Sequence, residues 1–77
     1  MTIAELRKDP EYSKCLEKVR SYPTGFEFTL QYSSIPKAKA NALRIIMSDC
    51  IELGLLDSVS ISLSLTGEET AITYRKI

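Results

Sequence analysis

The sequence predicts an α+β domain in the order helix, strand, helix, strand, strand, with two helices packed on one face of a three-stranded mixed sheet. Apolar residues recur at helical spacing in two segments and with a period of two in others. The 77 residues suffice for one hydrophobic core, so we expect a single domain over residues 1–77. A composition of 44% hydrophobic and 26% charged residues is typical of a globular chain rather than a disordered one.

The first helical region carries two start signals. Thr2 followed by Glu5 is a capping box, and Asp9 before Pro10 is an N-cap followed by the residue best suited to the first helical position. We therefore expect a helix that is kinked or broken near Asp9 and continues over residues 10–20. Its apolar face consists of Tyr12, Cys15, Leu16 and Val19.

The second helix is predicted over residues 33–53, where Ser33, Ser34 and Pro36 mark its start and Gly54 its end. Its expected buried face consists of Leu43, Ile46, Met47, Cys50, Ile51 and Leu53.

Three strands are expected, over residues 25–32, 56–65 and 70–77. Strands one and two, joined through the second helix, should be parallel with a right-handed crossover, and strand three should return as an antiparallel hairpin. The period-two pattern places one row of strand two toward the core: Val59, Ile61, Leu63 and Leu65. It places the other row on a polar outer face: Ser58, Ser60, Ser62 and Ser64.

Several classes of chemistry are disfavoured. The chain has no histidine, which excludes Ser-His and Cys-His nucleophile pairs and the commonest transition-metal ligand. Its glycines stand singly at element boundaries, so no phosphate-binding loop is present. Cys15 and Cys50 fall on apolar helix faces and are expected to be reduced core residues; Asp49 and Glu52 are expected on a solvated face. We expect no enzyme activity, metal or cofactor, and neither a membrane span nor an export signal.

The second helix contains a charge anomaly. Basic residues lie in its first half and acidic residues in its second, against the helix dipole at both ends. Spacings of four, three and four then align one exposed polar stripe, with an isoleucine beside it as an interface anchor. These predicted partner-binding residues are Lys37, Asn41, Arg44, Ser48 and, as the anchor, Ile45.

We therefore expect a cytoplasmic, non-catalytic binding or regulatory module, such as an inhibitor or adaptor, that contacts another protein through the second helix and an adjoining sheet edge. One alternative is a nucleic-acid-binding module that uses the basic stripe, although the net charge of zero provides no global attraction for phosphates. Another is a small thiol or sulfur-handling protein. An uncharged sheet edge also makes a homodimer plausible.

Overall fold

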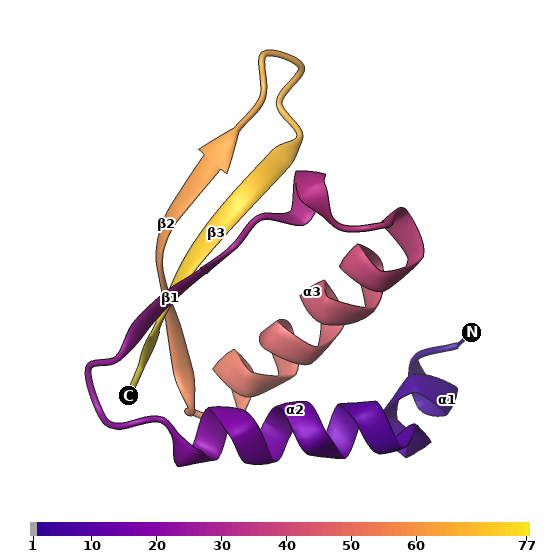
Figure 1. Ribbon diagram of the computed structural model, residues 1–77, viewed down its shortest axis with the longest axis vertical. Helices are drawn as coiled ribbons and strands as arrows, with labels where there is room; N and C mark the ends of the chain where they lie inside the picture. The colour runs from indigo at the N-terminus through magenta and orange to yellow at the C-terminus, as the bar shows by residue number, and fades with distance from the viewer. Residues whose placement is uncertain (1) are drawn as a thin grey trace.

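The computed structural model describes residues 2–77, which form a flat α+β domain measuring 34 × 32 × 18 Å. The α3 helix lies along one side of a three-stranded sheet, and α2 runs across the end of α3 (Figure 1). In chain order, the elements are α1 (Ile3–Lys8), α2 (Pro10–Ser21), β1 (Glu27–Leu30), the 3-10 turn η1 (Tyr32–Ser34), α3 (Lys37–Glu52), β2 (Leu56–Leu63) and β3 (Glu69–Lys76).

Local signals in the sequence set the starts of α1 and α2 and the end of α3. The predicted start of the second helix at residue 33 is wrong, because Ile35 precedes a proline and is extended, so that α3 begins only at Lys37. The Thr2 hydroxyl accepts the amide of Glu5 at 3.1 Å, and the Asp9 carboxylate accepts the amide of Glu11 at 2.8 Å. The predicted break at Asp9 is thus confirmed. At the other end of α3, Gly54 has a φ of +75°, which a residue with a side chain rarely adopts. The amide of Leu55 bonds back to the carbonyl of Cys50, which completes a Schellman stop.

The sheet confirms the α+β class but differs from the predicted pairing. The strand order is β1-β3-β2, and both pairings are antiparallel. The two strands joined by α3 do run in the same direction, as expected, yet β3 lies between them instead of at an edge. The expected mixed sheet is therefore wrong, because the hairpin strand inserts into the space that the α3 crossover leaves between β1 and β2.

A bulge in β2 changes which of its side chains face α3. Ser58 is opposite Tyr74, whereas Ile61 is opposite Ile72, and the register shifts between Ser58 and Ser60. Residues opposite one another in an antiparallel pair share a face, so Ser58 and Ile61 lie on the same face although they are three residues apart. The prediction that Ser58 lies on the outer face with the other serines is thus wrong, because the extra residue interrupts the alternation.

The core lies between α3 and the central part of the sheet. Cys50 and Leu56 are fully buried, and Ile46, Met47 and Tyr74 are nearly so. The hydroxyls of Tyr32 and Tyr74 bond to each other at 2.6 Å, which satisfies two polar groups inside an apolar region. Burial is the main reason that the pKa of each of these tyrosines is raised. The hydroxyl pair therefore stays uncharged and joins η1 to the central strand.

An ion pair with an added hydrogen bond joins the three helices. Arg7 of α1 donates two hydrogen bonds to the Asp49 carboxylate of α3, at 3.0 and 3.1 Å, and the Tyr12 hydroxyl of α2 donates a third at 2.6 Å. The Asp49 side chain is 12% exposed. The expectation that Asp49 belongs to a solvated face is therefore wrong, because the turn at Asp9 brings α1 and α2 onto it. These bonds, first that from Arg7 and then that from Tyr12, lower the pKa of Asp49.

The core position of Leu56 leads to a stability prediction. Leu56→Ala should lower the free energy of unfolding by about 2–5 kcal/mol, because it removes buried methyl groups and leaves a cavity. Leu65→Ala is the matched control, since Leu65 is fully exposed and its loss should change stability by about 0.5 kcal/mol or less. Urea unfolding of both variants measures the difference. Similar losses for the two variants would contradict the core described here.

The Asp49 contacts predict how stability depends on pH. Asp49→Asn should cost about 1–2 kcal/mol at pH 7, where the charge-assisted bonds of the native carboxylate are intact. Since the folded pKa of Asp49 is lowered, the unfolded chain takes up the proton first, and the native advantage is lost as pH falls below about 4. Urea unfolding between pH 7 and pH 2.5 should show the two proteins converging. Glu52→Gln, at an exposed position of the same helix, is the control; a constant gap between native and Asp49→Asn would refute this role.

Candidate interaction surface

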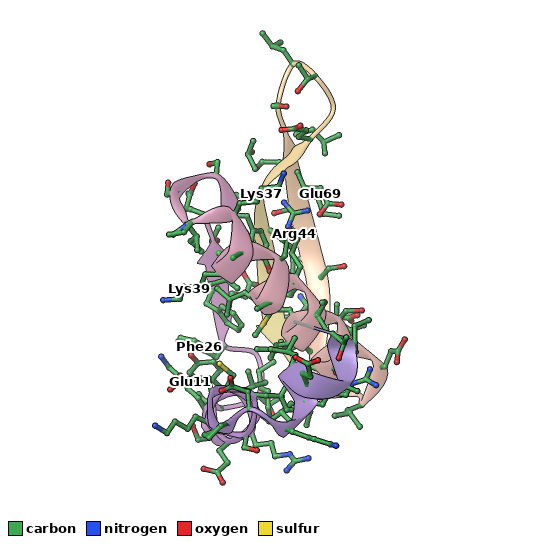
Figure 2. All side chains as sticks on the ribbon, turned by 90° about the vertical axis from the view of Figure 1, so that its right-hand side faces the viewer. Glu11, Phe26, Lys37, Lys39, Arg44 and Glu69 are labelled. Carbon is green, nitrogen blue, oxygen red and sulfur yellow. The ribbon has the colours of Figure 1, made fainter. Side chains whose placement is uncertain are left out.

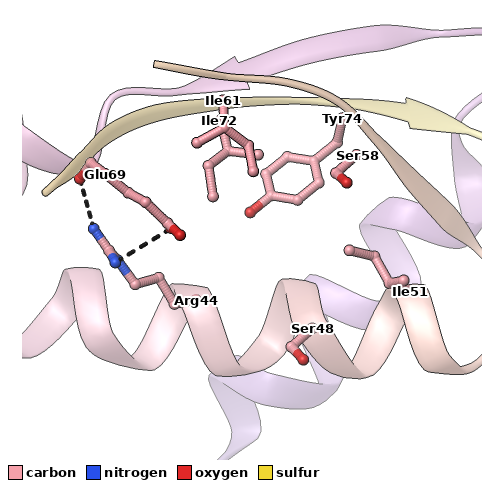
Figure 3. A pocket seen from close by; sticks show the side chains of 8 residues that line it. All are labelled: Arg44, Ser48, Ile51, Ser58, Ile61, Glu69, Ile72 and Tyr74. Carbon is pink, nitrogen blue, oxygen red and sulfur yellow. Dashed lines mark hydrogen bonds and ion pairs between the residues drawn. The ribbon is translucent and has the colours of Figure 1, made fainter. Parts of the chain in front are cut away.

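A cavity of about 240 Å³ lies between α3 and the β2-β3 hairpin (Figure 3). Its walls combine apolar side chains from both layers with a few polar groups at the rim. The lining residues are Arg44, Ser48, Ile51, Ser58, Ile61, Glu69, Ile72 and Tyr74. The second layer is thus incomplete above this part of the sheet.

The apolar side of β2 is exposed beyond its first residues, because α3 covers the centre of the sheet and the start of β2, where Leu56 is fully buried, but not the later part of the strand. Ile72 and Tyr74 on β3 are 8% and 3% exposed, whereas Ile61 on β2 is 52% exposed. The hairpin also extends past the first turn of α3 (Figure 1). The prediction that this row of β2 side chains is buried in the core is therefore wrong, although Ile61 does face α3. Exposed fractions in this row rise along the chain through Val59 at 44%, Ile61, Leu63 at 62% and Leu65 at 109%.

The free edge of β2 has little protection against pairing with another strand. In the part of the chain that the structure describes, β2 is hydrogen-bonded to β3 alone, so main-chain groups along its other side are open. Residues 58–67 contain no charged residue and no proline, the two features that most often protect edges. The opposite edge, β1, is only four residues long and carries Glu27, which pairs with Arg75 at 3.9 Å. The β2 edge is thus more open than the β1 edge to pairing with a further strand.

Arg44 of the predicted stripe is held by contacts within the chain. Its guanidinium donates to the Glu69 carbonyl at 2.8 Å and pairs with the Glu69 carboxylate at 3.5 Å. It also lies over the Tyr32 ring, 4.8 Å from the ring centre. Figure 2 shows Arg44 beside Glu69, with Lys39 pointing away from them. Arg44 is therefore already paired with an acidic residue of its own chain.

The other predicted partner-binding residues lie on two sides of α3, one that faces the β2-β3 hairpin and one that faces α1. Lys37 and Asn41 line a hollow with Arg44 and the acidic hairpin residues, and Ser48 lines the cavity beside Ile51. Ile45 is half-buried and packs toward α1, near Leu6, so the structure does not place it as an isolated exposed anchor. The structure brings together Arg44 and Ser48 at the cavity, with Lys37 and Asn41 beyond them.

Sequence reasoning did not identify Ile51 and Ile61 as surface residues. Their periodicity predicts core positions for both. The side chains do point toward the opposing layer, but periodicity carries no information about how far that layer extends. One signal in the sequence could have indicated this exposed surface. Residues 58–67 contain no charged residue, although a quarter of the chain is charged.

Both cysteine thiols are shielded from solvent to different degrees. Cys50 is fully buried, and burial raises its pKa to about 11. Cys15 is half-buried, and its pKa is raised mainly for the same reason. Both thiols are therefore protonated at neutral pH and are poor nucleophiles. Among residues 2–77, no group of three or more acidic or cysteine side chains is placed to hold a metal ion.

Comparison with models of known protein families, with curated proteins and with solved structures found no match. Between Thr2 and Ile77, none of the helices has the length and apolar character needed to cross a bilayer. The surface itself thus provides the basis for a functional proposal.

Proposed function

We propose that this chain is a non-catalytic protein-binding module, acting as an adaptor or inhibitor, that adds an extended strand of its partner to the free edge of β2. The observation that carries this proposal is the coincidence of an open main-chain edge with exposed apolar side chains on the same strand. Main-chain bonds to the added strand would provide affinity, and the cavity beside Ile61 would accept an apolar side chain from it. The expected occupant is therefore an uncharged, extended segment with apolar residues at alternate positions.

The charge distribution favours a protein partner over a nucleic acid. Lys37 and Arg44 share their hollow with Glu68 and Glu69, so the potential there is mixed and not strongly positive. Phosphate binding depends on several uncompensated basic residues. The elevated pKa values of both cysteines likewise do not favour the thiol alternative. The proposal includes a cytoplasmic setting, which is supported by two unpaired cysteines in the described chain.

Affinity capture from the native host with isoleucine variants tests this function. Ile61→Lys should lose the bound protein, because it places a charge in the apolar contact. Ile3→Lys, which makes the same change at a residue of equal exposure on α1, should retain it. Hydrogen exchange on the captured complex should show slowed exchange of β2 amides. Nuclease treatment should leave the complex intact.

Two results would contradict this function. One is a captured protein that binds Ile61→Lys and the native chain equally. The other is recovery of nucleic acid that is lost with Lys37→Glu and with added salt, which would favour the basic stripe instead.

A further inference from the structure

We infer that the strand occupying the β2 edge is β2 of a second copy of this chain. This inference rests on the proposed function and names the partner of the same surface. The two strands would run antiparallel about a two-fold axis perpendicular to the sheet. Each sheet would then continue into the other, in the order β1-β3-β2-β2-β3-β1.

One copy of the chain exposes more surface than is expected for its mass. A monomer of 8.6 kDa is expected to expose about 4,700 Å², whereas this chain exposes 5215 Å². Its radius of gyration, 12.5 Å, also exceeds the roughly 11.5 Å expected for a compact domain of this length. The excess of about 500 Å² is a large part of the roughly 800 Å² that each partner buries in an interface of standard size.

The exposed apolar side chains are concentrated along β2 and the hairpin loop that follows it. Ile61, Leu63 and Leu65 follow one another after the bulge, along the end of the strand and the start of the hairpin loop, and Val59 is exposed at the bulge itself. Ile51 of α3, 38% exposed, lines the cavity that opens beside Ile61. A two-fold axis perpendicular to the sheet keeps both α3 helices on the same face. The two cavities would then adjoin, and the apolar residues of each copy would cover those of the other.

The charge within β2 is compatible with pairing between two copies of this strand. If the Ile61 residues of the two copies face each other, Val59 of each copy is opposite Leu63 of the other. Asp57, the charged residue within β2, is then opposite Leu65. The two Asp57 side chains would be separated by eight residues along the strand, or about 27 Å, which exceeds the Debye length of about 8 Å at physiological salt. Self-pairing therefore keeps the two Asp57 charges far apart.

Sedimentation equilibrium of the native chain and of edge variants tests the inference. The native chain should have a mass of about 17 kDa, twice 8.6 kDa, at micromolar concentration. Ile61→Lys should raise the dimer dissociation constant by about 100-fold or more, because two lysines would meet at the two-fold axis. Ser62→Lys, on the outer face of the same edge, should raise the dimer dissociation constant by about tenfold without changing a buried residue.

The controls separate an effect on the interface from an effect on folding. Ile3→Lys and Ser13→Lys make the same substitutions at exposed sites on α1 and α2 and should leave the native mass unchanged. Far-ultraviolet circular dichroism should be the same for all variants. A native chain of 8.6 kDa at up to about 1 mM would overturn the inference, as would a dimer that both edge lysines leave intact. Capture of a different protein that depends on Ile61 would still support the proposed function.

Discussion

The position of β3 between β1 and β2 is the constraint from which the rest of the structure follows. A strand with hydrogen-bonded neighbours on both sides is the natural centre of the core, and α3 accordingly packs over Ile72 and Tyr74. The same helix covers the start of β2, where Leu56 is fully buried, but it does not reach the later part of that strand, where Ile61 is exposed. The longer of the two remaining strands, β2, is therefore left with both a free main-chain edge and an uncovered apolar side.

The bulge near Val59 determines which side chains of β2 face α3. It allows fully buried Leu56 and exposed Ile61 to face α3 from opposite parts of the same strand. One end of β2 is thereby anchored in the core, while the other end extends beyond it. An anchored strand presents its free edge in a defined orientation, which reduces the entropy lost when another strand pairs with it.

Much of the fold could be predicted because its determinants are local. The caps at Thr2 and Asp9 and the stop at Gly54 each depend on residues within a few positions, and all three are as expected. Strand order and the bulge could not be predicted, because they depend on contacts between distant segments. The contacts of Arg44 with Glu69 were missed for the same reason. The charges of α3 oppose its dipole, and two of them, Arg44 and Asp49, have partners of opposite charge on other elements, Glu69 and Arg7.

The most direct measurement of the central claim, that β2 pairs with another copy of itself, is an isotope-filtered nuclear Overhauser experiment on a mixture of labelled and unlabelled chains. We expect contacts between copies among main-chain protons of residues 59–63, together with contacts between Ile61 side chains. Contacts between copies that lie only on α2 or β1, or an absence of any contact between copies at millimolar concentration, would contradict it.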